Sequence, residues 1–153
     1  MIPDHIKKLL SEFAVRANLP DISFNDDALC HLVINDEYPL SLRYNANNNR
    51  VTLFSELATI DPDNVTTAWL SFVLNSAYNS FHEMEPGVGK HPQSNSLVAF
   101  FHLDVESLNV DSLETSVVYF IEWQAKWLHH EKSLSNQSPS HHNTIPQNHS
   151  LRV

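Results

Sequence analysis

Apolar and polar residues alternate along residues 29–57, LCHLVINDEYPLSLRYNANNNRVTLFSEL. A period of two is typical of β-strands, because successive side chains point to opposite faces of a sheet. In the first strand both faces carry apolar residues, so we expect both to be buried. The alternation does not say which face of the sheet forms the core. The pattern predicts three strands, over residues 29–34, 38–44 and 51–55.

Asparagine is expected to shape the turns between these strands. The chain contains only two glycines, so another residue must supply the positive φ angles that tight turns require. Asparagine tolerates these angles better than other residues with a side chain. We therefore predict turns at residues 35–37 and at Asn45 and residues 47–49.

Three other stretches repeat their apolar residues every three or four positions, which is the spacing of one helical face. Asp61 is positioned to cap the second helix, and Asp111 with Glu114 has the spacing of a capping box at the third. Residues 97–103 alternate again and form a hairpin with a short strand near Val88. The predicted fold is an α+β domain with a twisted antiparallel sheet of about five strands. Its three helices are predicted at residues 2–18, 61–82 and 111–131.

The apolar stripe of the helix predicted at residues 61–82 is wider than one contact requires. About half of the stripe is expected to be core, and the surplus is a candidate subunit interface. The stripe contains Val65, Trp69, Phe72, Val73, Ala77 and Phe81, with Leu70, Leu74 and Tyr78 beside it.

Composition limits the classes of function. A net charge of −9 opposes direct binding to nucleic acid and favours basic protein partners. Residues 1–132 are predicted to form one domain, and residues 133–153 a polar tail that buries too little surface to fold. No secretion leader or membrane span is apparent, and the single cysteine, Cys30, suits a reducing compartment, so we expect a cytoplasmic protein with no membrane contact.

No residue pattern indicates catalysis or a cofactor. The histidines are scattered or adjacent, whereas metal ligands on a helix need a spacing of three or four. The segment PGVGKHP lacks the further residues of a phosphate-binding loop, and Cys30 and His31 point to opposite faces of one strand. We predict no catalytic residue, metal or cofactor, although a small metal-dependent enzyme that uses the histidines stays open as a rival.

Several segments resemble a known family. The order of elements, with IKKLLSEFAVRANLPDISFNDDALCHLVIND, resembles class I type III secretion chaperones of the CesT/Tir chaperone superfamily. The segments LLSEFAVRANLP, SELATID and EWQAKW and the terminal RV look most like the ExsC-type regulatory chaperones. The resemblance spans about residues 5 to 130, and GVGKHPQSNS is more polar than the usual fourth strand of the family.

The resemblance implies a small acidic homodimer that holds an extended segment of a secreted protein without catalysis. The ExsC-type resemblance further implies two competing ligands, a small secreted regulator and an anti-activator of type III secretion genes. Export of the regulator would free the chaperone to sequester the anti-activator and so raise transcription. An ordinary effector chaperone of the same fold is the alternative.

A partner segment can add a strand to a sheet edge and insert alternate side chains into pockets. On this basis the predicted partner groove consists of Ile6, Leu10, Leu40, Leu42, Tyr44 and Phe54. The predicted dimer contact consists of Trp69, Phe72, Val73 and Phe100.

Overall fold

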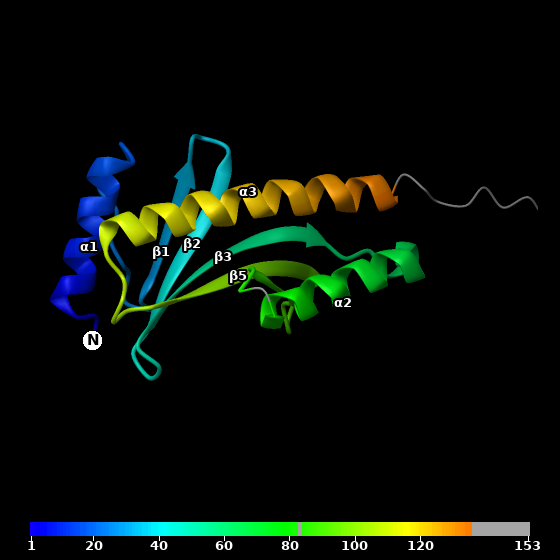
Figure 1. Cartoon of the computed structure of the whole chain (residues 1–153), viewed down its shortest axis with the longest axis horizontal. Coiled ribbons are helices and arrows are strands. Elements are labelled where there is room, and N and C mark those ends of the chain that lie inside the picture. Colours follow the sequence, from blue (N-terminus) through cyan, green and yellow to red (C-terminus); the bar gives the residue numbers. More distant parts are fainter. Residues whose placement is uncertain (83, 136–153) are drawn as a thin grey trace, which may run out of the picture.

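The computed structural model describes residues 1–82 and 84–135 (Figure 1). Three helices and a five-stranded antiparallel sheet confirm the predicted α+β fold and its order of elements. The elements are α1 (Asp4–Arg16), β1 (Leu29–Ile34), β2 (Tyr38–Asn45), β3 (Arg50–Thr59), the short 3-10 helix η1 (Pro62–Asn64), α2 (Thr67–His82), β4 (Gly87–Lys90), β5 (Ser96–Asp104) and α3 (Val110–Ser135).

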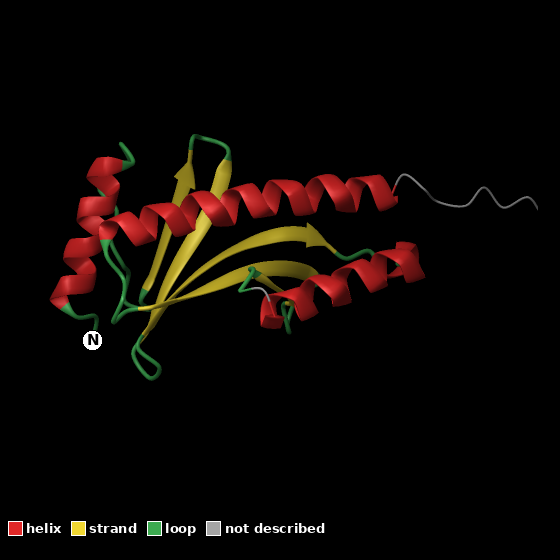
Figure 2. Ribbon diagram, viewed as in Figure 1, coloured by secondary structure: helices red, strands yellow, loops and turns green. Residues whose placement is uncertain are grey.

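The strands lie side by side in the order β1-β2-β3-β5-β4, so β1 and β4 form the two edges. Strand β3 is longer than predicted and contains a bulge between Glu56 and Ala58. The extra residue, Leu57, is buried, and the strand continues to pair with β5 beyond it. A bulge bends and twists a strand locally, and the long strands curve in Figure 2.

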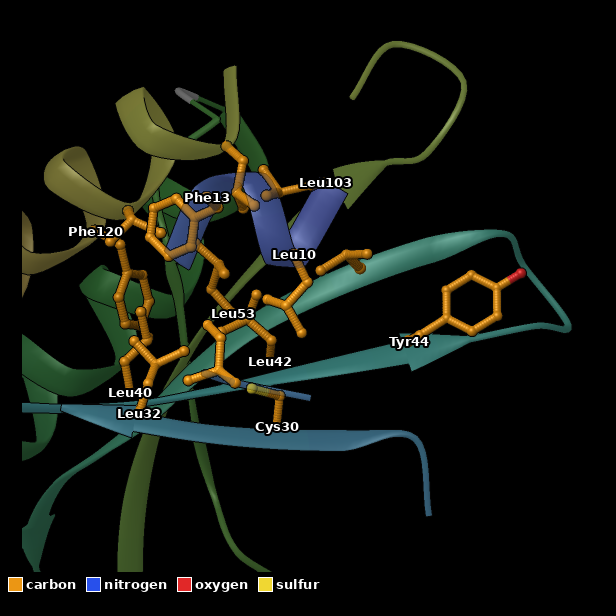
Figure 3. Close-up of a cluster of buried hydrophobic side chains, with 14 of the residues drawn as sticks. Leu10, Phe13, Cys30, Leu32, Leu40, Leu42, Tyr44, Leu53, Leu103 and Phe120 are labelled. Carbon is orange, nitrogen blue, oxygen red and sulfur yellow. The ribbon is translucent and has the colours of Figure 1, made fainter. Parts of the chain in front are cut away.

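Helices α1 and α3 cover the same face of the sheet, and the hydrophobic core lies between them and the strands (Figure 3). Phe13 of α1 and Phe120 of α3 are at most 1% exposed, and they point toward Leu42 and Leu53 of the sheet. Burying side chains of this size stabilises the fold by about 2 kcal/mol each. An ion pair between Arg16 and Asp111 joins the end of α1 to the start of α3.

Two helix starts differ from the prediction. Asp61 caps η1 by accepting a hydrogen bond from the backbone N–H of Asp63, and α2 begins only at Thr67, after Thr66 accepts from the backbone N–H of Trp69. Helix α3 begins at Val110, because Asn109 and Ser112 exchange two side-chain to backbone hydrogen bonds of 2.9 Å. Asn109 and Ser112 therefore take the capping role that was assigned to Asp111 and Glu114.

Asparagine and aspartate shape turns, as predicted. The φ angles of Asn35, Asp36 and Asn49 are 53°, 57° and 49°, whereas neither glycine has a positive φ. Gly87 and Gly89 serve a different purpose, because the ring of Phe100 on β5 lies against the backbone of β4 at these positions.

Helix α3 runs to Ser135, so the first residues of the predicted tail are helical. The remainder of that tail, residues 136–153, lies outside the described residues. Within the described ranges no helix combines the length and the apolar character that a membrane span requires.

Candidate partner-binding surfaces

The sheet face that points away from α1 and α3 is the first candidate surface, and we call it the open face. The open face consists of His31, Val33, Pro39, Ser41, Arg43, Thr52, Phe54, Glu56, Val98, Phe100 and His102. It holds a groove of about 500 Å³. The groove is lined by Pro39, Ser41, Phe54, Ser55, Glu56, His91, Ser94, Ser96 and Val98, all of which belong to strands or to the loop between β4 and β5. Within the described residues, no helix contributes to the lining of the groove.

Polar groups on the open face are arranged across the strands. His31 Nδ1 lies 2.7 Å from the Ser41 hydroxyl, and His102 Nδ1 lies 2.9 Å from the Thr52 hydroxyl. Partial burial, and to a lesser extent the charge of Arg50, lowers the pKa of His102. This imidazole is therefore held in its neutral form at neutral pH. The open face thus offers the hydroxyls of Ser41 and Thr52 and the neutral imidazole of His102 around half-buried Phe54 and Phe100.

The outer face of β1 differs from the sequence prediction, which expected it to be buried. His31 is exposed and Val33 is 50% exposed, because both belong to the open face. Among the described strands, β1 pairs only with β2, so its other side is a sheet edge six residues long. An edge of this kind can accept an added strand through backbone hydrogen bonds.

The second candidate surface is an apolar stripe on α2. Four side chains spaced three or four residues apart are between 46% and 84% exposed. We call them the α2 stripe: Leu70, Leu74, Tyr78 and Phe81. A row of large apolar side chains on one helix face is uncommon on a monomer and typical of an interface. The α2 stripe agrees with the excess apolar width that the sequence indicates for this helix.

The four residues predicted to form the dimer contact are not part of the α2 stripe, although three of them lie on α2. Trp69, Phe72 and Val73 are half-buried against the core of their own chain. The Phe72 ring packs at 5.0 Å from Trp127 and 4.7 Å from His130, measured between ring centres. The Trp69 indole N–H donates to Glu131 Oε1 over 3.2 Å. These contacts join α2 to α3. The α2 stripe is more exposed, and it combines Phe81 of the predicted stripe with Leu70, Leu74 and Tyr78, which the sequence placed beside that stripe.

Phe100, the fourth residue of the predicted dimer contact, belongs to β5 and to the open face. It lies opposite Phe54 of β3 in the sheet register, and its ring covers Gly87. Phe100 therefore lies next to Phe54, a predicted partner contact, and not with Trp69, Phe72 and Val73 of the predicted dimer contact.

Of the predicted partner contacts, only Phe54 lies on the open face, where it is half-buried and lines the groove. The other five are between 1% and 7% exposed and belong to the core beneath α1 and α3: Ile6, Leu10, Leu40, Leu42 and Tyr44. These five side chains pack between the sheet and the two helices, on the side opposite to the open face. On β2, Leu40, Leu42 and Tyr44 alternate with Pro39, Ser41 and Arg43. This alternation is the signal that could have identified the open face.

Two buried polar links join the surfaces to α3. The Gln124 amide donates to the Ser55 hydroxyl over 3.1 Å, and that hydroxyl donates to the Pro39 carbonyl over 2.9 Å. The Trp127 indole N–H donates to the Ser76 hydroxyl over 3.0 Å. One link reaches the groove wall and the other reaches α2.

Neither surface, as far as the structure describes it, contains a metal-ligand cluster or an exposed thiol. Cys30 is a buried free thiol, and burial raises its pKa, so the thiolate is disfavoured. Across residues 1–82 and 84–135 no group of three or more His, Cys, Asp or Glu side chains could hold a metal ion.

An open sheet face, a free strand edge and an exposed helix stripe define a protein that binds other polypeptides. The sequence matches the Tir chaperone protein (CesT) family over residues 8–128, and the chain belongs to this family of type III secretion chaperones. Proteins of this family bind and do not catalyse, in agreement with the prediction that the chain is not an enzyme.

Solved structures share the fold. A chain of the HopA1–SchA chaperone–effector complex is similar over 84% of this chain and 99% of its own length, with 21% identity and a TM-score of 0.72. A chain of the ExsC–ExsE complex is similar over 82% and 92%, with 17% identity and a TM-score of 0.70. A chain of the Yersinia pestis type III secretion chaperone SycH in complex with a fragment of YscM2 is similar over 79% and 98%, with 14% identity and a TM-score of 0.61. No curated protein matches the sequence.

Proposed function

We propose that this chain is a cytoplasmic chaperone that holds a secreted protein before export through a type III system. The observation that carries the proposal is the open face, whose groove spans β2, β3 and β5, together with the free edge of the neighbouring strand β1. An extended segment of the partner pairs with β1, and apolar side chains from another part of the partner cover Phe54 and Val98 on β3 and β5. Family membership and the chaperone complexes with similar folds support this role.

We further propose that the partner is a small secreted regulator and that a second ligand, an anti-activator, competes for the same chaperone. When the regulator is exported, the free chaperone binds the anti-activator, and transcription of the secretion genes rises. Mass action between two ligands is sufficient for this switch. The segments LLSEFAVRANLP and SELATID support it by their resemblance to the ExsC type, and delivery of one or more effectors is the alternative.

The α2 stripe is proposed as the contact between two copies of the chain. Burial of Leu70, Leu74, Tyr78 and Phe81 against the same residues of a second copy would remove a continuous apolar row from water. The contact lies on α2, away from the groove-lining residues, so both copies keep a groove for a partner.

The test is a pull-down of the tagged chain from its own host with secretion off and with secretion on, followed by mass spectrometry. A small secreted protein that gives way to a non-secreted regulator supports the switch, and one large effector under both conditions supports plain delivery. Phe54→Asp should abolish capture, whereas Val15→Asp on the exposed side of α1 should not, since Val15 is 81% exposed and does not line the groove. Equal capture by both variants would place the partner elsewhere.

A further inference from the structure

The edge of β1 offers fewer backbone groups than its length suggests. In an antiparallel ladder, successive residues of one strand direct their backbone groups to opposite sides. The Tyr44 N–H donates to the Ala28 carbonyl over 3.0 Å, so every second residue from Ala28 onward bonds to β2. The backbone groups of Leu29, His31 and Val33 therefore point to the free edge.

Asn25 already occupies the first of these three positions. Its backbone N–H donates to the Leu29 carbonyl over 2.8 Å, and its side-chain oxygen accepts from the Leu29 N–H over 2.9 Å. Among the residues that the structure describes, none bonds to the outward N–H and C=O groups of His31 and Val33. An added strand therefore finds two N–H and two C=O groups, all within three residues of β1.

Carboxylates lie at both ends of this edge. Two acidic residues stand just beyond each end of β1, Asp26 and Asp27 before it, and Asp36 and Glu37 after it. All four are exposed, and none forms an ion pair within the described part of the chain, not even with Arg43 of the neighbouring β2. Residues 17–42 contain five Asp or Glu and no Lys or Arg. The local charge therefore favours a cationic ligand.

A second copy of the chain does not suit this edge. Antiparallel pairing of two copies through His31 and Val33 brings the acidic pair before β1 of each copy to the acidic pair after β1 of the other. Parallel pairing brings each acidic pair to its own counterpart. Both arrangements place like charges together, and natural sheets use such charges to prevent association through their edges. A strand with basic residues at both ends avoids this repulsion.

The length of a suitable strand follows from strand geometry. The six residues of β1 span about 17 Å, and seven extended residues span about 20 Å. If the third and fifth residues of the added strand pair with Val33 and His31, its first and seventh residues lie near the acidic pairs. These alternate residues all point to the side of the open face, whereas the second, fourth and sixth point to the side of Leu32.

We infer that the edge of β1 selects an extended segment of about seven residues that has Lys or Arg at both ends. Asn25 limits the segment by occupying the place beside Leu29, and the two acidic pairs bind its basic ends. Apolar residues at its second, fourth and sixth positions continue the core side of the sheet beside Leu32. This inference rests on the proposed function, and it adds the chemistry of the segment and the residues that select it.

The inference is tested with three acetylated and amidated peptides in NMR titrations of the full chain. One peptide is Lys-Val-Thr-Val-Thr-Val-Lys, one has Glu at both ends, and one keeps both Lys but has Pro at its three central positions. The Lys peptide should bind about five-fold or more tightly than the Glu peptide at low salt, since repulsion replaces attraction at both ends. High salt should reduce this ratio. The Pro peptide should not bind, because it lacks the N–H groups that a strand donates.

Hydrogen exchange in the same samples locates the contact. The Lys peptide should slow exchange of the amides of His31 and Val33. It should leave the amide of Leu29 unchanged, because that N–H already bonds to Asn25. Slowed exchange at the edge distinguishes strand addition from a loose attraction between the acidic chain and a basic peptide.

Removal of one carboxylate from each end gives the matched variant. Asp27→Asn with Asp36→Asn should lower the ratio of the two affinities at least about two-fold. Asparagine suits the φ angle of 57° at Asp36, so the turn is kept. Glu106→Gln with Glu122→Gln removes the same charge from exposed sites outside the edge and should leave the ratio unchanged.

The inference is overturned if the Lys and Glu peptides bind equally, if none binds, if the Pro peptide binds as well as the Lys peptide, or if protection appears only at other amides. A secreted protein in the host pull-down that is lost with Phe54→Asp would then still support the proposed function. A Lys peptide bound at His31 and Val33, with no secreted protein in the pull-down, would keep the edge as a strand receptor and remove the role in secretion.

Discussion

Gly87→Ala should destabilise the chain, whereas Gly89→Ala two residues away should not. A Cβ atom at Gly87 would lie 2.5 Å from Cζ and 2.6 Å from Cε2 of Phe100. A Cβ atom at Gly89 would lie 3.6 Å from the Phe100 ring, which is an ordinary contact distance. Both glycines are on β4, and neither has a positive φ, so alanine strains the backbone at neither position.

The size of the effect follows from two opposing terms. Separating Cβ from the Phe100 ring requires a movement of about 1 Å, and forced overpacking costs about 1–3 kcal/mol. Replacing glycine by alanine recovers about 0.4–1 kcal/mol from the unfolded state. Since the ring of Phe100 is only partly buried and can swing outward, we expect Gly87→Ala to lose about 1 kcal/mol and Gly89→Ala to be neutral or slightly stabilised.

Urea unfolding followed by circular dichroism measures both values, and unchanged m-values would show that only stability has changed. Phe100→Leu provides the internal check, because it removes the ring that the new methyl group meets. In a double-mutant cycle the cost of Gly87→Ala should largely disappear in the Phe100→Leu background. Equal stabilities of the two alanine variants, or a cost that survives in Phe100→Leu, would refute the packing of Phe100 on β4.

Three further outcomes follow from burial and exposure. Leu42→Asp should unfold the chain, because an unpaired carboxylate cannot be accommodated at a site 1% exposed, whereas Ser41→Asp on the open face should leave circular dichroism unchanged. A folded Leu42→Asp variant would remove this side chain from the core. Leu74→Asp should convert the proposed dimer to a monomer in light scattering, and Asn75→Asp, on the same helix, should not; identical masses would place the contact elsewhere. Cys30 should react with a thiol reagent much more slowly than cysteine in the urea-unfolded chain at mildly alkaline pH, since burial raises its pKa and blocks access.

Strands and helices could be predicted from the sequence because the spacing of the apolar residues is clear in each element. The alternation along β2 separates Leu40 and Leu42 from Ser41 and Arg43, and that separation is correct. Alternation alone does not say which set the helices cover, because that depends on how α1 and α3 pack across the sheet. The most apolar set lies in the core, and the open face is built from the less apolar set.

Helix ends were harder to predict from the sequence. Asp111 and Glu114 have the spacing of a capping box, but Asn109 and Ser112 form it, and the ion pairs of Arg16 with Asp111 and Glu114 use the two carboxylates instead. The competing contact comes from α1, which lies 95 residues away along the chain. A local motif cannot include a partner that only the fold brings near.

Two buried hydrogen bonds of α3 join it to the groove wall and to α2. Pro39, in the groove wall, is tied through Ser55 to Gln124, and Trp127, one turn further along the same helix, is tied to Ser76 of α2. Breaking either link leaves a buried polar group unsatisfied, at a cost of about 1–3 kcal/mol. A ligand that displaces Pro39 in the groove wall must therefore move Gln124 of α3 with it or lose the energy of that link.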